Sequence, residues 1–202
     1  MTHPDAMIDG SCDPRFDAVR SAFIENFAKG DLGASCAVTL EGEPVVDLWG
    51  GHRDLARRTP WERDTIVNVW STTKMLTALC VLMLHDRGIL SVDAPMADYW
   101  PEFAANGKAD VLVRHVLGHT AGLPVFDELV DDLALFDWAE CCRRLAAQAP
   151  RWNPGEELGY HSETQGWLLG ELVRRVDGRS LGTFFRDEVA GPLGLEIGRA
   201  HV

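Results

Sequence analysis

The sequence is poor in basic residues and in long apolar runs. It has 19 lysines and arginines against 31 aspartates and glutamates, which gives a net charge of −12. Nucleic acids and anionic membranes are bound through basic surfaces, so this balance argues against both as partners. The longest mostly apolar run, residues 75–84, is well short of the roughly 18 residues that a membrane-spanning helix needs. Because the N-terminus also lacks the basic and apolar segments of a signal peptide, we expect a cytoplasmic protein.

The cysteines form no recognisable disulfide or metal-binding pattern. Their number is five, which is odd, and Cys141 and Cys142 are adjacent. No C-x-x-C pair occurs, so the sequence favours reduced thiols and indicates neither a metal nor another cofactor. A content of 46% hydrophobic and 25% charged residues is ordinary for a globular protein, and 202 residues suit one domain or most of one.

The apolar pattern predicts an α+β arrangement that begins with a helix and a β-hairpin. Apolar residues recur at helical spacing over residues 16–29, and two β-prone runs follow at 34–40 and 45–49. Two strands alone are marginal, so the sheet needs more strands than these. Residues 71–87 are apolar on nearly every face and predict a buried helix. Further helices are expected over residues 111–117, 138–148, 162–176 and 180–189, with Ser162 and Ser180 as N-caps.

The stretch Ser71-Thr72-Thr73-Lys74 places a serine and a lysine on one face of the first helical turn. A helix N-terminus favours negative charge, which helps an alkoxide to form on Ser71. A neutral Lys74 could take the serine proton directly, whereas a charged Lys74 could stabilise a nearby phenolate; either makes Ser71 a nucleophile for acyl transfer. The alternative is a helix-capping serine beside a lysine that reaches solvent, and composition alone produces an S-x-x-K in about one such chain in ten.

A second candidate is Gly159-Tyr160-His161-Ser162, which follows an N-P-G turn and precedes a helix. Residues two apart in an extended segment project to the same side, so Tyr160 and Ser162 could share a site. Tyr160 could be the general base for Ser71, and Ser162 could relay the proton or bind substrate. A half-buried loop tyrosine and a capping serine are the structural alternative.

A third candidate is the compact turn of residues 117–124, L-G-H-T-A-G-L-P. His119 could be catalytic, but we favour a role in which it hydrogen-bonds the loop backbone and shapes the wall of a site. The other histidines, His161 among them, lack metal-ligand spacing and are interpreted as structural.

Three motifs of this chain, in their order, resemble those of the serine β-lactamase-like superfamily. They are S-T-T-K, L-G-H-T-A-G-L-P and Y-H-S-E-T-Q-G-W-L-L-G-E-L-V. This superfamily includes class C β-lactamases, D-alanyl-D-alanine carboxypeptidases and β-lactamase-like carboxylesterases. The resemblance covers nearly the whole chain and implies an antiparallel sheet flanked by helices, with a helical subdomain. It also implies that Ser71 is the acylated nucleophile, Lys74 its partner and Tyr160 the base, with Ser162 and His119 in supporting roles. Ser162 stands where class C β-lactamases usually have asparagine, which favours the esterase branch.

The resemblance further implies a third motif, such as K-T-G, H-x-G or W-G-G, on a later strand that supplies the second oxyanion donor. Only Trp49-Gly50-Gly51 occurs, and because it precedes Ser71 we interpret it as the end of a strand. We therefore expect residues 1–196 to be the N-terminal portion of a single domain, with only its first strands and its helical region. Residues 197–202 back-translate into a sequencing-adapter sequence and are predicted to be a non-native tail. A chain shortened in this way is expected to be poorly soluble and to have little or no activity.

The sequence thus predicts a serine hydrolase that forms an acyl-enzyme with small esters or amides and needs no cofactor. Carboxylesterase activity is favoured, with a β-lactamase or D-amino-acid peptidase as the alternative. A non-catalytic ligand-binding relative is the alternative of another class, and a helical interaction module is a third. The presence of Ser71, Lys74 and Tyr160 together favours the enzyme. The oligomeric state is not predicted.

Overall fold

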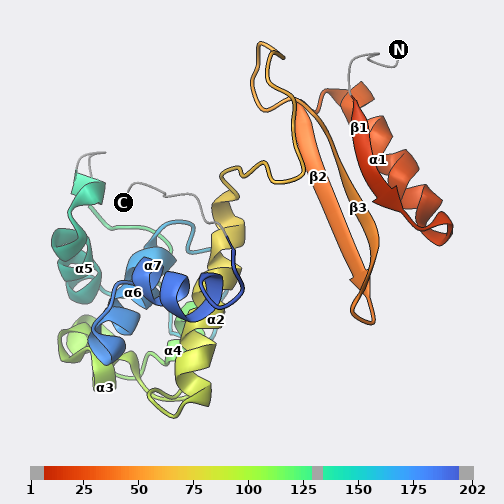
Figure 1. Ribbon diagram of the computed structural model, residues 1–202. Coiled ribbons are helices and arrows are strands. Elements are labelled where there is room, and N and C mark those ends of the chain that lie inside the picture. The colour runs from red at the N-terminus through yellow and green to blue at the C-terminus, as the bar shows by residue number, and fades with distance from the viewer. Residues whose placement is uncertain (1–6, 129–133, 196–202) are drawn as a thin grey trace. The chain divides into compact units, whose positions relative to one another are not determined.

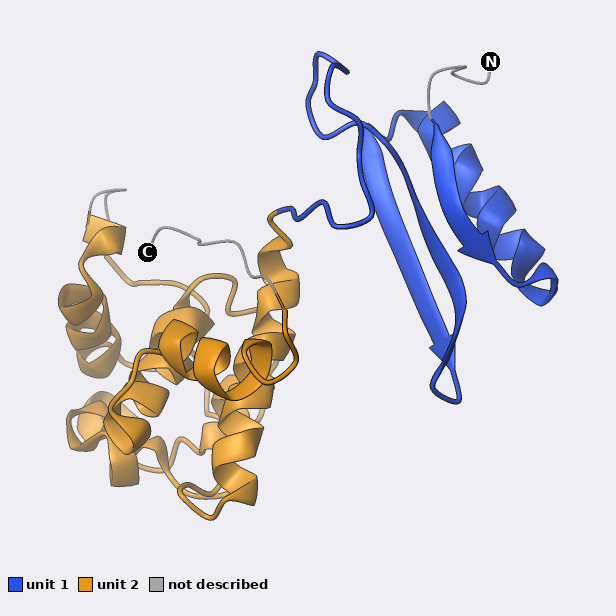
Figure 2. Cartoon of the chain, viewed as in Figure 1, with its two compact units in different colours: residues 1–67 blue, residues 68–202 orange. Residues whose placement is uncertain are grey.

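The chain is represented by a computed structural model that describes residues 7–128 and 134–195 (Figure 1). It divides into two compact units, residues 1–67 and residues 68–202 (Figure 2). The tail predicted to be non-native, residues 197–202, lies outside the described residues.

The first unit is a small antiparallel sheet with one long helix. Strands β1 (Ile8–Cys12), β2 (Gly33–Leu40) and β3 (Glu43–Gly51) lie in the order β1-β3-β2. A 3₁₀ turn, Pro14–Phe16, leads into α1 (Asp17–Lys29), which ends at the left-handed Gly30. The predicted first helix and hairpin are therefore confirmed, and β3 does end at Trp49-Gly50-Gly51.

Strand β1 was not predicted, because its sequence I-D-G-S-C has neither an apolar run nor a clear alternation. It pairs with β3 along its whole length, from Ile8 opposite Gly50 to Cys12 opposite Val46. Gly10 has φ of +104°, and a Cβ there would lie 2.0 Å from the carbonyl oxygen of Asp47. Glycine is required at this point because the two strands approach each other so closely.

Helix α1 packs on one face of the sheet, as Figure 1 shows, and supplies the small core of this unit. Phe23 and Phe27 are buried one turn apart, with ring centroids 5.4 Å apart in an edge-to-face arrangement. They meet the buried side chains of Val46 and Leu48 on β3. The helical period of α1 and the alternation along β3 thus direct their apolar residues into one layer.

The second unit is helical in the part of it that the structure describes. Its α-helices are α2 (Thr73–Asp86), α3 (Met96–Tyr99), α4 (Val113–Leu117), α5 (Trp138–Ala147), α6 (Thr164–Asp177) and α7 (Leu181–Phe185). Shorter turns join them: 3₁₀ segments at Trp70–Thr72, Pro101–Gly107 and Ala134–Phe136, and a π-helical turn at Arg186–Ala190. The chain thus has one antiparallel sheet and a separate helical region, which confirms the predicted α+β class.

Helix α6 lies at the centre of the core of this unit. Leu168, Leu169, Leu172 and Val173 are fully buried on it and pack among side chains from every other helix of the unit. The helix ends close to the predicted residue 176, at Gly178, which is left-handed with φ of +88°. Ser180 is the N-cap of α7 as predicted, because its hydroxyl accepts a hydrogen bond from the Thr183 N–H.

The helix after Ser71, predicted to be buried, is buried on one side within its own unit and exposed on the other. Thr77, Cys80, Val81 and Leu84 of α2 are buried. Met75, Leu76, Leu79 and Leu82, also on α2, are 37–66% exposed. An apolar composition on all sides shows that a helix avoids water, but it does not show which part of the protein covers each side.

Candidate active site

Ser71 lies at the N-terminal entrance of α2, in the 3₁₀ turn Trp70–Thr72. The preceding Trp70 has φ of +48°, a conformation that is strained for a bulky residue. The Trp70 N–H is held by a 3.0 Å hydrogen bond to Oδ1 of Asn68. The backbone turn therefore presents Ser71 at the surface, just before the first regular turn of the helix. No sequence pattern around Trp70 predicts this strain.

Lys74 and Ser71 meet, as their spacing of three residues predicts. The Lys74 Nζ donates a hydrogen bond of 3.3 Å to the Ser71 hydroxyl. It donates a second one, of 2.6 Å, to the backbone carbonyl of Ser162. Lys74 therefore joins the start of α2 to the segment that precedes α6, and these two helices pack against each other (Figure 1).

Tyr160 lies beside Ser71 and Lys74 and is half exposed. The Lys74 Nζ is 5.0 Å from the centroid of its ring. Hydrogen bonds with Ser71 and, secondly, with Lys74 lower the pKa of the Tyr160 phenol from its ordinary value of 10.0. The structure thus brings the serine, the lysine and the tyrosine together, although the tyrosine is far from the other two in sequence.

Ser162 contributes its backbone to this group. Its carbonyl accepts from Lys74, and its N–H donates to the Tyr160 carbonyl at 3.0 Å. The prediction that Ser162 caps the following helix is wrong, because α6 begins at Thr164 and its N-cap is Glu163. The turn between residues 160 and 162 places Ser162 one residue too early to cap the helix.

His119 holds the backbone on both sides of Tyr160. Its carbonyl accepts from the Gly159 N–H, and its Nδ1 accepts from the His161 N–H, each at 3.1 Å. Its ring centroid lies 4.8 Å from that of Tyr160. His119 thus hydrogen-bonds backbone groups, but those of residues 159 and 161 and not those of its own turn, for which we predicted the contact. The left-handed φ of His119, +61°, is what lets its ring and its carbonyl reach the same segment.

His161 is fully buried under the site, and its importance was missed from the sequence. Its Nε2 accepts a hydrogen bond of 3.0 Å from the Leu123 N–H, and its Nδ1 lies 2.6 Å from the Gly159 carbonyl. Gly159 fits against the ring of Trp152, which a Cβ at that position would approach to 2.3 Å. The position of His161 between Tyr160 and Ser162 was the available signal.

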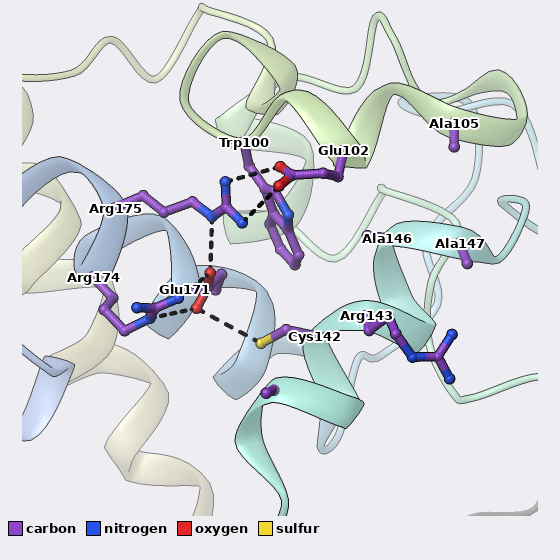
Figure 3. Close-up of a pocket in the computed structure, with 11 residues that line it drawn as sticks. Trp100, Glu102, Ala105, Cys142, Arg143, Ala146, Ala147, Glu171, Arg174 and Arg175 are labelled. Carbon is purple, nitrogen blue, oxygen red and sulfur yellow. Dashed lines mark hydrogen bonds and ion pairs between the residues drawn. The ribbon is translucent and has the colours of Figure 1, made fainter.

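A cavity lies elsewhere in the helical unit, between α5, α6 and the turn Pro101–Gly107 (Figure 3). It measures about 410 Å³ and is built around the carboxylate of Glu171. This carboxylate is buried and accepts hydrogen bonds from Arg174, Arg175 and Trp138. Burial raises the pKa of the adjacent Cys142 to about 12, so that thiol remains protonated. The cavity therefore holds a satisfied ion-pair network and no reactive group.

The residues that the structure describes contain neither a metal-ligand cluster nor a helix that could span a membrane. No cluster of three or more histidine, cysteine, aspartate or glutamate side chains there has an arrangement that could bind a metal ion. Each described helix is too short or too polar to traverse a lipid bilayer.

Comparison with known proteins shows the same family throughout. The chain is 42% identical to the esterase/beta-lactamase LipL of Mycobacterium tuberculosis over 97% of its length and 47% of that protein. It superposes on a penicillin-binding protein homologue from Caulobacter crescentus with a TM-score of 0.90 and 48% identity, covering 94% of this chain and 52% of the other. It superposes on a family VIII carboxylesterase with a TM-score of 0.86 and 48% identity, covering 93% and 52%.

The chain spans about half the length of the curated relatives it matches. The family model for beta-lactamase matches residues 20–197, which include all five candidate site residues and most of both units. The predicted β-lactamase-like fold is confirmed by the superpositions. The chain belongs to the serine β-lactamase-like superfamily.

Proposed function

We propose that this chain carries the nucleophile of a serine hydrolase and that the nucleophile is Ser71. The observation that carries the proposal is the meeting of Ser71, Lys74 and Tyr160 at the entrance of α2. The Ser71 oxygen attacks the carbonyl carbon of an ester and forms a tetrahedral intermediate. The leaving alcohol departs with a proton, an acyl-enzyme remains on Ser71, and water then releases the acid.

Tyr160 is the proposed proton acceptor for Ser71. Its lowered pKa favours the phenolate, and the Lys74 Nζ is close enough to stabilise that negative charge. The alternative, in which Lys74 takes the proton itself, is supported by its direct hydrogen bond to the Ser71 oxygen. The Ser71 backbone N–H, at the positive end of α2, is the proposed oxyanion donor from this part of the protein. The hydroxyl of Ser162 is a proposed contact for substrate.

Small esters are the proposed substrates. Two similar proteins carry names that support this choice, an esterase/beta-lactamase and a family VIII carboxylesterase. The first of these names, together with the penicillin-binding protein homologue, also supports a β-lactam or a D-amino-acid peptide as the alternative. A non-catalytic ligand-binding role would leave the lowered pKa of Tyr160 without a purpose. A cytoplasmic location remains part of the proposal and is supported by five free cysteines.

Covalent labelling tests the nucleophile without requiring turnover, which suits a chain about half as long as its relatives. A fluorophosphonate should add once to the chain, as read by intact mass, and should not add to Ser71→Ala. Ser35→Ala, which removes an exposed serine on β2, is the matched control and should label as the parent does. Labelling of Ser71→Ala, or no labelling of a folded parent, would overturn the proposal. The rate of hydrolysis of p-nitrophenyl butyrate is then compared with that of a chromogenic cephalosporin. This comparison distinguishes an esterase from a β-lactamase.

A further inference from the structure

The segment that carries Tyr160 is attached to the turn of residues 118–124 by two imidazoles, one from each side. His119 reaches across from the turn to residues 159 and 161. His161 reaches back from the segment to the Leu123 N–H. Tyr160 lies between Gly159 and His161, the two residues whose backbone N–H groups donate to His119. The Tyr160 ring also contacts the His119 ring.

Each imidazole uses one unprotonated nitrogen as an acceptor. Nδ1 of His119 accepts from a backbone N–H, so its proton must be on Nε2. Nε2 of His161 accepts from a backbone N–H, so its proton is on Nδ1, where it donates to the Gly159 carbonyl. Both hydrogen bonds require neutral rings with opposite tautomers.

The surroundings of the two rings keep them neutral. Burial, and then the positive charge of Lys74, lower the pKa of His119 below 6.5. Burial likewise lowers the pKa of His161 and outweighs the opposing effect of its hydrogen bond with the Gly159 carbonyl. A ring held neutral by its surroundings retains the acceptor that its backbone partner needs.

We propose that His119 and His161 form a two-histidine clamp that positions Tyr160 and the Ser162 carbonyl against Lys74 and Ser71. This rests on the proposed function, since it assigns the clamp to the activation of Ser71. Neither histidine touches a reacting atom; both act through Tyr160 and Ser162. Reactions of this kind are sensitive to placement, and a displacement of about 1 Å can cost on the order of 100-fold in rate.

The test replaces His119 with two residues that both tolerate a left-handed backbone. His119→Asn keeps an acceptor oxygen at the position of Nδ1, whereas His119→Gly removes the acceptor and the ring. Two quantities are measured on each folded variant: the rate of fluorophosphonate labelling, and the ionisation midpoint of Tyr160 from ultraviolet absorbance. We expect His119→Gly to label on the order of 100-fold more slowly and to raise the Tyr160 midpoint towards 10.0. His119→Asn should restore most of the rate and the low midpoint.

The two readouts separate the clamp from the proposed function. If Ser71→Ala labels like the parent, the proposed function fails, while the Tyr160 midpoint still reports on the clamp. If His119→Gly keeps both the parental rate and the parental midpoint, the clamp is overturned. If both His119 variants fail to fold, His161→Gln, whose Oε1 can replace Nε2 as the acceptor, is compared with His161→Ala by the same two measurements. Equal rates and midpoints in that pair would equally overturn it.

Discussion

The Lys74 Nζ donates a 2.6 Å hydrogen bond to the backbone carbonyl of Ser162, a residue 88 positions further along the chain. This bond is shorter than the 3.3 Å bond from the same nitrogen to the Ser71 hydroxyl. A carbonyl is an acceptor only, so it fixes one donor of Lys74 and orients the rest of the ammonium group. Ser71 is therefore connected through Lys74 to the segment before α6.

Because this connection uses the backbone of Ser162, removing the side chain should not break it. We expect Ser162→Ala to change the free energy of unfolding by less than about 0.5 kcal/mol, as for most surface substitutions. Lys74→Met removes the donor of both hydrogen bonds and should cost about 1–2 kcal/mol, at a usual net value of about 1 kcal/mol for each. Urea unfolding of the two variants beside the parent measures both. Equal losses would show that the Ser162 hydroxyl, and not its carbonyl, stabilises this contact.

Tyr160 should ionise at a lower pH than an ordinary tyrosine. Hydrogen bonds with Ser71 and Lys74 favour its phenolate, so removing either partner should move its midpoint up towards 10.0. Ultraviolet titration can resolve this, because the chain has only two tyrosines and Tyr160→Phe identifies the absorbance of Tyr160 by subtraction. Ser71→Ala and Lys74→Met should each raise the midpoint. An unchanged midpoint in both variants would contradict the arrangement of these three side chains.

Local contacts of the site could be predicted from the sequence, and its distant contacts could not. The meeting of Ser71 and Lys74 follows from helical spacing, and the glycines that end α1 and α6 are typical stop signals. No periodicity places Tyr160 beside Ser71, since Tyr160 lies in the segment before α6 and Ser71 in the turn before α2. Only the order of the three motifs, and the family it resembles, indicated that pairing.

The misses have physical causes of the same kind. His161 looked ordinary because a loop sequence does not show that the residue is buried. Its two ring nitrogens hydrogen-bond the backbone of Leu123 and Gly159. Strand β1 is held by backbone pairing with β3, which its own side chains do not signal. Ser162 was predicted to cap a helix from residue type alone, whereas a turn shifts the helix start to Thr164. Sequence patterns report local preference, and tertiary contacts decide these cases.

Glu171 should be the most costly carboxylate to remove from the helical unit. Burial alone would raise its pKa, but hydrogen bonds from Arg174, Trp138 and Arg175 outweigh that effect and lower the pKa to about 2 (Figure 3). Breaking a buried ion pair by removing one partner typically costs about 3–5 kcal/mol. We expect a loss of that order for Glu171→Gln in urea unfolding.

Glu140 provides a matched control, because it also pairs with arginines three and four residues later. Its side chain is 28% exposed, against 2% for Glu171, so Glu140→Gln should have a much smaller effect. The pH dependence has a definite sign. The contribution of Glu171 is complete above its ordinary pKa of 4.5 and is lost as pH falls from there towards 2. Equal losses of unfolding free energy for the two variants would show that burial does not increase the contribution of Glu171 to stability.

Substitution by alanine should have opposite effects on stability at two glycines of α6 that lie one turn apart. A Cβ on Gly170 would lie 2.5 Å from the ring of Trp138, whose Nε1 is held by Glu171 and which therefore cannot move away freely. A Cβ on Gly166 would meet nothing within 4 Å. We expect Gly166→Ala to stabilise the fold by up to about 1 kcal/mol, the helix-propensity difference between the two residues. Gly170→Ala should destabilise it by about 1–3 kcal/mol, as overpacking does. Thermal unfolding of both variants measures the contrast, and stabilisation by Gly170→Ala would show that Trp138 is not fixed against α6.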